Sequence, residues 1–255
     1  DVLSNAVRQQ KIIDSISKPA EFTWTWDRYK KLFIEDKRIT NGKLFIKNNL
    51  QTLERAEKEF GVPKEVITAI LGVETRYGKI QGSYRVIDSL LTLGFDYPRR
   101  AKFFRKELVD FFLLTRENDL NINEIKGSYA GAMGYGQFIS SSYRAYAIDY
   151  DGDGYADLFS SVNDAIGSIA NYLYIHGWKK EGQIIHDAYP NIVRKVFKPN
   201  KNLSKYIPLS FNEGGKDIYF IGDDNFIAIT KYNVSHFYAM AIYYLSEELK
   251  KWKNY

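Results

Sequence analysis

The stretch PKEVITAILGVETRYG, residues 63–78, decides the fold around it. Pro63 suits the first turn of a helix, and Gly78 suits the residue after its last turn. The stretch therefore predicts a helix from Pro63 to Tyr77. Its apolar residues recur at helical spacing and form one stripe, which consists of Val66, Ile67, Ile70 and Leu71. The next position on that stripe is Glu74, where a leucine would be expected.

Glu74 is therefore a candidate catalytic residue. Burying an ionised, unpaired carboxylate is costly, so we expect the pKa of Glu74 to be raised, as a general acid requires. A structural glutamate paired with Arg76, Lys79 or a distant arginine would give the same pattern. The helix alone does not decide between these two interpretations.

The composition is that of a globular protein of 255 residues, 45% hydrophobic and 26% charged. Its net charge of +5 suits an acidic partner such as nucleic acid, anionic lipid or a cell-wall polymer. The charge is spread along the chain, so we expect no nucleic-acid arm. The absence of cysteine excludes disulfides and thiolate metal sites. No run is apolar enough to span a membrane, and the start at Asp1 indicates a mature or trimmed form.

The pattern along the chain predicts a mainly α protein of the α+β class. Helices are expected at 48–60, 86–93, 99–118, 164–176 and 235–252, and the alternation in FTWTW (22–26) indicates an extended stretch. Residues 127–139, GSYAGAMGYGQFI, contain four glycines and predict a loop in which backbone closely approaches another group. The runs IPLSFN, DIYFIG and FIAITKYN, between residues 206 and 233, predict a small antiparallel β unit.

The pattern by itself indicates a mostly α protein with a small β insertion, and the family resemblance given below implies a division into three domains. Residues 1–60 form an N-terminal α region that packs with the C-terminal helix 235–252. A catalytic core covers 61–190, and a small antiparallel β domain covers 191–233.

The segment DYDGDGYAD, residues 149–157, matches an EF-hand calcium loop within residues 149–164. Asp149, Asp151 and Asp153 occupy the first, third and fifth positions, and glycine occupies the sixth. The alternative is an acidic surface turn, but this register favours a structural calcium ion that fastens the Gly-rich segment to the following helix. Ser160 stands where the bidentate glutamate is usual, and Asp157 and Asp164 are the available substitutes.

A second catalytic carboxylate is not evident. Most glycosidases pair two carboxylates, and the candidates here are Asp88, Asp96 and Asp110. Asp88 and Asp110 are expected on solvated helix faces, so a mechanism with one carboxylate is more economical. The three histidines show no zinc spacing, and no organic cofactor is expected.

Five stretches together are similar to the membrane-bound lytic transglycosylase B family, including its soluble form. They are ILGVETRYG, SYRVIDSLLTLGFDYPRRAKFFRKEL, GSYAGAMGYGQFISSSYRAYAIDYDGDG, NDAIGSIANYLYIHGW and KYNVSHFYAMAIYYL. The resemblance implies a lysozyme-like catalytic core with an α domain, a small β domain and an EF-hand-like calcium site. It also implies cleavage of the peptidoglycan bond between N-acetylmuramic acid and N-acetylglucosamine without water, leaving 1,6-anhydromuramoyl ends.

The resemblance also implies roles for individual residues. Glu74 would be the single catalytic acid and base. The residues that would bind or shape the substrate site are Tyr29, Arg99, Arg100, Ser128, Met133, Gln137, Phe138, Tyr172, Tyr232, Asn233 and Tyr238. The calcium ligands would be Asp149, Asp151, Asp153, Tyr155 and Asp164, although one extra residue separates the loop from Asp164.

From the resemblance we expect a monomer in the bacterial periplasm or cell envelope, lipid-anchored at the outer membrane in its full-length form. Its partners would be peptidoglycan glycan strands and proteins of cell-wall synthesis or lysis, and not nucleic acid. Two alternatives remain open at this point: a muramidase that uses water, and an inactive peptidoglycan-binding scaffold.

Overall fold

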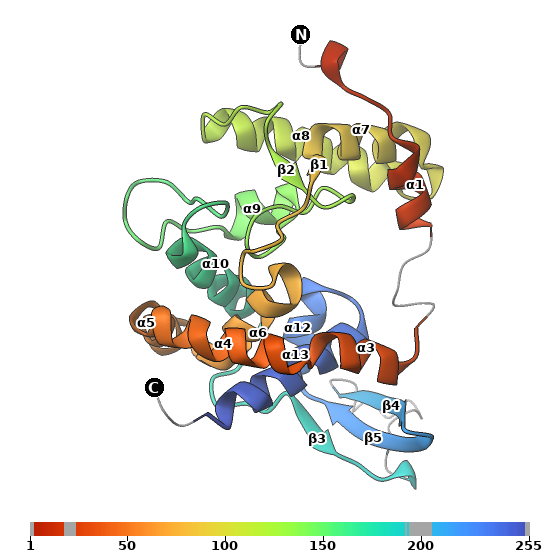
Figure 1. Ribbon diagram of the computed structural model, residues 1–255, viewed down its shortest axis with the longest axis vertical. Coiled ribbons are helices and arrows are strands. Elements are labelled where there is room, and N and C mark those ends of the chain that lie inside the picture. Colours follow the sequence, from red (N-terminus) through yellow and green to blue (C-terminus); the bar gives the residue numbers. More distant parts are fainter. Residues whose placement is uncertain (1–2, 18–23, 192, 194–205, 253–255) are drawn as a thin grey trace. The chain divides into compact units, whose positions relative to one another are not determined.

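The computed structural model describes residues 3–17, 24–191, 193 and 206–252 (Figure 1). The chain divides into two compact units, each built from two segments. Unit 1 contains Asp1–Thr23 and Glu74–Ser168, and unit 2 contains Trp24–Val73 and Ile169–Tyr255. Helices α6 (Lys64–Thr75) and α10 (Val162–Ile175) each contribute to both units. The predicted three-domain division stays a prediction.

Unit 1 is mostly helical. Its elements are η1 (Leu3–Asn5), α1 (Gln10–Ile16), α7 (Val86–Asp96), η2 (Pro98–Arg100), α8 (Ala101–Glu117) and α9 (Ser140–Tyr146), with the short strands β1 (Tyr84–Arg85) and β2 (Lys126–Gly127). Helices α7 and α8 lie side by side, and α1 and α9 pack against them (Figure 1). The two strands pair antiparallel, with Tyr84 opposite Gly127.

Unit 2 combines helices with a three-stranded antiparallel sheet. Its helices are α3 (Trp26–Phe33), α4 (Asp36–Asn48), α5 (Leu50–Phe60), α12 (Asp224–Tyr232) and α13 (His236–Lys250). The sheet has the order β3–β5–β4, formed by Ile185–Asp187, Lys216–Gly222 and Ile207–Glu213. Helix α13 packs against both α3 and α4.

Helix α6 is shorter than the sequence predicts. It begins at Lys64, with the Pro63 carbonyl accepting the first helical hydrogen bonds, and it ends at Thr75. Arg76 and Tyr77 do not continue it because both have left-handed backbone angles, with φ of 51° and 63°. The predicted apolar stripe is confirmed, since all four of its residues are 0% exposed, whereas Glu74 is half-buried.

The segment FIAITKYN does not form the predicted strand. It belongs to α12, whose first turn is capped by Asp223: Oδ1 of that residue accepts from the Asp224 N–H at 2.8 Å. Phe226 and Ile229 lie three residues apart and are both 0% exposed, which is the spacing of a buried helix face. Their β-prone side chains misled the prediction, and the third strand is β3 instead.

The start of α3 also differs from the expectation. Trp26 already lies in the helix, and Thr25 accepts from the Arg28 N–H as its cap. Residues 22 and 23 of the predicted extended stretch lie outside the described residues. The longer predicted helices otherwise agree with α5, α7, α8, α10 and α13 to within a few residues, and Gly61 ends α5 in the left-handed conformation.

The Gly-rich segment is the predicted close-packed loop. Met133 and Phe138 exchange two backbone hydrogen bonds across it, at 2.9 and 3.0 Å. A Cβ atom on Gly134, whose φ is 68°, would lie 2.3 Å from the Leu158 carbonyl oxygen. Only glycine therefore allows this backbone to contact the end of the Asp loop, residues 149–164.

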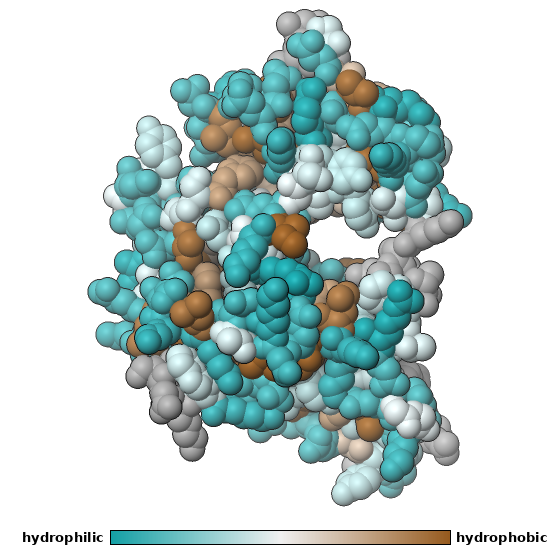
Figure 2. Space-filling model, in the orientation of Figure 1, coloured by the Kyte–Doolittle hydropathy of each residue, from teal (hydrophilic) through white to brown (hydrophobic). Residues whose placement is uncertain are grey.

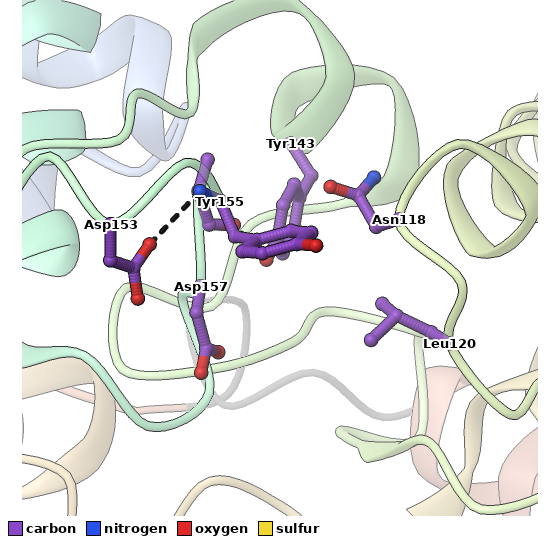
Figure 3. A pocket seen from close by; sticks show the side chains of 7 residues that line it. Asn118, Leu120, Tyr143, Asp153, Tyr155 and Asp157 are labelled. Atoms are coloured by element: carbon purple, nitrogen blue, oxygen red, sulfur yellow. Dashed lines mark hydrogen bonds between the residues drawn. The ribbon is translucent and has the colours of Figure 1, made fainter.

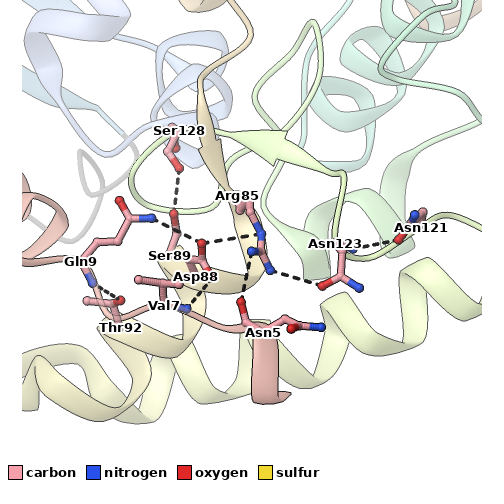
Figure 4. A network of polar contacts seen from close by, with 10 residues as sticks. All are labelled: Asn5, Val7, Gln9, Arg85, Asp88, Ser89, Thr92, Asn121, Asn123 and Ser128. Carbon is pink, nitrogen blue, oxygen red and sulfur yellow. Dashed lines mark hydrogen bonds and ion pairs between the residues drawn. The ribbon is translucent and has the colours of Figure 1, made fainter. Parts of the chain in front are cut away.

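A buried carboxylate fastens the N-terminal segment to α7 (Figure 4). Asp88 is 2% exposed, so the predicted position on a solvated face is wrong. Its Oδ1 accepts from the Val7 N–H at 2.9 Å, and its Oδ2 accepts from Gln9 Nε2 at 3.3 Å and lies 3.6 Å from Arg85 Nε. This carboxylate is thus committed to holding two segments of unit 1 together.

Figure 2 shows one face of the molecule, on which hydrophilic residues predominate and hydrophobic ones form small scattered groups. Among the described residues, no helix combines the length and apolarity needed to cross a membrane.

Candidate active site

Glu74 lies one residue before the end of α6, where the backbone turns sharply. Thr75 is 1% exposed and ends the helix. Its Oγ1 accepts from the Gly78 N–H at 2.9 Å and donates to the Tyr135 carbonyl oxygen at 2.8 Å. Tyr135 belongs to the Gly-rich segment, so the helix end that carries Glu74 is tied directly to that segment.

The Gly-rich segment holds four of the predicted substrate-site residues. Met133 and Phe138 are buried, at 0% and 3% exposure, consistent with residues that shape a floor. Gln137 is half-buried and has a φ of 52°, and its Nε2 donates to the carbonyl oxygens of Gln81 and Gly134, both at 3.0 Å. The amide nitrogen is thus held by the protein, and Oε1 is the end of Gln137 that can accept from a ligand.

Ser128 has a structural function in the same segment. Its Oγ accepts from the N–H groups of Ala130 at 3.2 Å and Ala132 at 3.0 Å, which stabilises the turn. The hydroxyl proton is still available to donate. The structure therefore shows a structural role for Ser128, and its role in ligand binding stays a prediction.

Arg99 and Arg100 lie in η2 and are exposed. The Arg100 guanidinium stacks over the Phe103 ring at 4.4 Å and lies 5.2 Å from the Phe104 ring. This contact favours a packing role for Arg100 over a ligand-binding one.

The tyrosines of the predicted site are in unit 2. Tyr172 donates to the Lys231 carbonyl oxygen at 2.6 Å, and its ring lies 4.9 Å from the Tyr232 ring. Tyr232 and Tyr238 are nearly parallel, at 6° and 6.4 Å. The structure thus brings these three rings together, and their role in substrate binding stays a prediction.

Two further residues of unit 2 behave differently from these rings. Asn233 Oδ1 accepts from the Ser235 N–H at 3.0 Å, next to the start of α13. Tyr29 is 3% exposed and packs against Phe33 and Phe237, at 4.7 and 5.6 Å between ring centroids. A core position is the simpler interpretation of Tyr29.

Sequence reasoning missed His176. It stacks on Tyr172 with 4.0 Å between ring centroids and an interplanar angle of 20°, and its Nδ1 lies 2.7 Å from the Tyr172 carbonyl oxygen. The spacing of four residues along one helix was the available signal. Thr75 and Gln81 were also missed, because a buried hydroxyl and a loop amide carry no motif.

The Asp loop contains an acidic triad that can hold a metal ion. Asp149, Asp151 and Asp153 each offer a carboxylate oxygen, and these three oxygens lie within 4.8 Å of one another. All three residues are exposed. Hard oxygen ligands grouped in this way are what Ca²⁺ prefers. The carboxylate of Asp149 also accepts from the N–H groups of Gly152, Asp153 and Gly154, which curls the loop around it.

Asp164 is 0% exposed, and its carboxylate orders the loop through hydrogen bonds to the loop backbone. Its Oδ1 accepts from the N–H groups of Tyr150 and Asp151, at 2.7 and 3.2 Å, and its Oδ2 accepts from that of Asp157 at 2.7 Å. Burial raises the pKa of Asp164, and the three N–H donors oppose that rise. Asp164 therefore orders the loop whether or not it also contacts an ion, and its predicted ligand role stays a prediction, as does that of Tyr155.

A pocket of about 260 Å³ lies beside the Asp loop in unit 1 (Figure 3). Its lining residues are Asn118, Leu120, Tyr143, Asp153, Tyr155, Ala156 and Asp157. The hydroxyl of Tyr143 donates to the Ala156 carbonyl oxygen at 2.6 Å and accepts from the Leu158 N–H at 3.0 Å. Burial raises the pKa of that tyrosine well above its usual value, so it stays neutral.

The three candidates for a second catalytic carboxylate all have basic partners. Besides Asp88 with Arg85, Asp96 lies 3.3 Å from Arg8, and Asp110 lies 2.6 Å from Arg144. An acid that must cycle its proton is poorly served by a permanent cation at that distance. These pairs favour the one-carboxylate interpretation.

The fold is that of known lytic enzymes. Membrane-bound lytic murein transglycosylase B of Escherichia coli (strain K12) is 38% identical, over 97% of this chain and 76% of that protein. Soluble lytic transglycosylase SltB1 from Pseudomonas aeruginosa has a TM-score of 0.90 and 42% identity, covering 98% of this chain and 91% of that one. The Escherichia coli lytic transglycosylase Slt35 in complex with calcium has a TM-score of 0.87 and 37% identity, covering 98% and 86%.

The class of protein is therefore a mainly α, lysozyme-like lytic transglycosylase. Residues 1–247 match the family described as "Transglycosylase SLT domain", and the chain belongs to that family.

Proposed function

We propose that this enzyme cleaves the β-1,4 bond between N-acetylmuramic acid and N-acetylglucosamine in peptidoglycan, with Glu74 as its only catalytic acid and base. Glu74 donates its proton to the bridging oxygen as the C1–O bond breaks. The substrate's own N-acetyl oxygen stabilises the positive charge at C1 as an oxazolinium ion. The muramoyl C6 hydroxyl then attacks C1, and the bond from C1 to the acetamido oxygen breaks, which regenerates the N-acetyl group. The hydroxyl proton passes to the Glu74 carboxylate, which restores the acid and leaves a 1,6-anhydro ring.

One observation carries this proposal. The three other candidate carboxylates, those of Asp88, Asp96 and Asp110, each lie within 3.6 Å of an arginine nitrogen. Glu74 is half-buried at the end of α6. A second, water-activating carboxylate would have to come from elsewhere. The substrate's acetamido and C6 hydroxyl groups supply the nucleophiles without it.

We also assign the remaining predicted residues to substrate binding. Ser128 offers a hydroxyl donor and Gln137 offers Oε1, while Met133 and Phe138 lie beneath them in the same segment. The tyrosine group of unit 2 offers ring faces of the kind on which sugar rings stack. Arg99, Arg100, Asn233 and Tyr29 are the weaker assignments, because other contacts explain their positions.

We further assign the acidic triad to a structural calcium ion. The Slt35 structure with calcium and the three grouped carboxylates support it. The ion would neutralise like charges held close together and so stabilise the loop between α9 and α10. Glycan strands would be the macromolecular partner, in the periplasm or cell envelope.

The deciding experiment is mass spectrometry of digested sacculi. Anhydromuramoyl products should be about 18 mass units lighter than hydrolysed ones, because no water is added. Muramoyl products with reducing ends alone would establish a muramidase instead. Unchanged sacculus release by the Glu74→Gln variant would indicate a binding scaffold.

A further inference from the structure

Thr75 stands next to the proposed catalytic residue, and its side chain contacts two other parts of the chain. It is the last helical residue and is 1% exposed. One hydroxyl group joins two partners: it accepts from the Gly78 N–H at 2.9 Å and donates to the Tyr135 carbonyl oxygen at 2.8 Å. The first contact closes the turn that follows Glu74, and the second attaches that turn to a segment 60 residues further on.

The turn that Thr75 closes is strained. Arg76 and Tyr77 have φ of 51° and 63°, and Gly78 follows with 83°. A left-handed backbone costs about 1 kcal/mol or more for each residue with a side chain, so neighbouring contacts must hold it. A Cβ on Gly78 would lie 1.9 Å from the Tyr135 ring. The turn and Tyr135 are therefore in close contact, with no space between them for another atom.

The acceptor of the Thr75 hydroxyl is itself firmly anchored. The Tyr135 N–H donates to the Leu158 carbonyl oxygen at 2.9 Å. Gln81 Nε2 donates to the Phe159 carbonyl oxygen at 3.1 Å, a parallel link from the loop after Gly78. The end of α6 is therefore connected, through Tyr135 and Gln81, to the Asp loop, which Asp164 orders.

We propose that Thr75 is a positioning residue for Glu74: its hydroxyl fixes the last turn of α6 to Tyr135 and so sets where the Glu74 carboxylate lies. This inference rests on the proposed catalytic role of Glu74. Glu74 must reach the bridging oxygen and later the C6 hydroxyl from one position. A displacement of 1 Å can cost about 10²-fold in rate, so a small relaxation of the turn affects turnover more than binding.

The test compares Thr75→Val with Thr75→Ser on soluble peptidoglycan fragments. Valine keeps the shape but removes the hydroxyl, and we expect kcat to fall at least about tenfold while KM stays within about twofold. Serine keeps the hydroxyl and should restore kcat to within about threefold of the native value. Thr115→Val is the matched control: Thr115 is a 5% exposed threonine of α8, bonded to the Phe112 carbonyl oxygen, and this variant should keep the native kcat.

Hydrogen exchange of the Gly78 amide provides a readout besides activity. Thr75→Val should accelerate the exchange, because the Gly78 N–H loses the hydroxyl oxygen that accepts its hydrogen bond. Thr75→Ser keeps that oxygen and should not accelerate the exchange. A kcat for Thr75→Val within about twofold of native, or a Thr75→Ser variant as slow as Thr75→Val, overturns the inference. Thr75→Ala, which adds no atoms, carries the same test if Thr75→Val does not fold. Full activity of Glu74→Gln in the same assay would instead refute the proposed function, whatever the Thr75 variants do.

Discussion

The indole Nε1 of Trp26 donates a 3.0 Å hydrogen bond to Oε2 of Glu213, which is 187 positions away in the chain. The other oxygen of Glu213 accepts from Lys30 Nζ at 2.6 Å. Asp27 adds a third contact by accepting from the Gly214 N–H at 3.1 Å. Helix α3 is thus fastened to the β4–β5 hairpin at its tight turn, within unit 2.

This fastening should weaken in acid. The Lys30 ammonium holds the pKa of Glu213 below its usual value, with a further contribution from Trp26 and partial opposition from burial. A lowered folded-state pKa means that the stabilisation is complete above the unfolded-state value, about 4.3, and is lost as pH falls through the folded-state value. We therefore expect Glu213→Gln to lower Tm at pH 7, and we expect its Tm difference from the native chain to shrink as the pH falls below the unfolded-state pKa.

The matched control is Glu248→Gln, which removes a surface ion pair with Lys251 three residues away on α13. Exposed pairs of this kind contribute little, so its Tm should follow the native curve at every pH. Equal Tm differences for Glu213→Gln at pH 7 and pH 3 would contradict the assigned cause.

Replacing Glu74 by glutamine should separate catalysis from folding. The amide has nearly the same shape but can neither donate a carboxylic proton nor accept one from the C6 hydroxyl. We expect the release of soluble fragments from sacculi to fall by at least about 10²-fold. Tm and sacculus binding should remain native.

Glu124→Gln provides the control for this experiment, since Glu124 is exposed near β2. It should retain native activity. A Glu74→Gln variant that no longer binds sacculi would indicate a binding role for that residue instead of an acid and base role.

Calcium should raise the thermal stability of the native chain. A ligand at 100 times its Kd stabilises by about 2.7 kcal/mol, which is roughly 5–10 °C in a chain of this size. Asp149→Asn should abolish this rise, because it removes one charge from the triad, while its Oδ1 can still accept from the N–H groups of Gly152 and Asp153. Differential scanning calorimetry with calcium and then with chelator measures the Tm of the native chain and of the Asp149→Asn variant.

Magnesium at the same concentration should have a smaller effect, because it requires a stricter octahedral geometry. Asp217→Asn removes an equal charge from β5, far from the loop in sequence, and should leave the calcium response unchanged. An identical Tm for the native chain with calcium and with chelator would count against a bound ion.

Asp88→Ala should be strongly destabilising. It leaves the Val7 N–H and the Arg85 guanidinium without the carboxylate that they contact at 2.9 and 3.6 Å. Breaking a buried, charged hydrogen-bond network costs about 3 kcal/mol. Denaturant unfolding monitored by circular dichroism measures the free energy of unfolding.

Asp88→Asn is a milder variant for comparison with Asp88→Ala, because its amide oxygen can still accept from the Val7 N–H. It should cost less than the alanine variant. A free energy of unfolding for Asp88→Ala within about 0.5 kcal/mol of native would show that the N-terminal segment contributes little to stability.

Local patterns in the sequence predicted much of this protein. The apolar stripe of α6 follows from 3.6-residue periodicity, and the left-handed residues Gly61 and Gly78 follow from the freedom of glycine. The runs IPLSFN and DIYFIG predicted the strands of the β4–β5 hairpin, whose turn residues Gly214 and Gly215 have φ of 59° and 79°. Alternate aspartates predicted the acidic triad. Each of these depends on residues within a few positions of one another.

Two features depended on the tertiary structure instead. The segment around Phe226 became a helix because Asp223 caps it and two apolar residues are buried on one face. Asp88 lies in the interior, where its carboxylate accepts a hydrogen bond from the backbone N–H of Val7, which is 81 residues earlier in the chain.

The immediate surroundings of Glu74 show most clearly which features the local sequence determines and which features the tertiary structure determines. The sequence alone determined that a carboxylate continues an apolar helix face. The tertiary structure decided that the helix stops one residue later, that Arg76 and Tyr77 turn left-handed, and that Thr75 bonds to Tyr135. No local pattern encodes these outcomes, because the energy that holds a strained turn comes from contacts between segments that are distant in the chain.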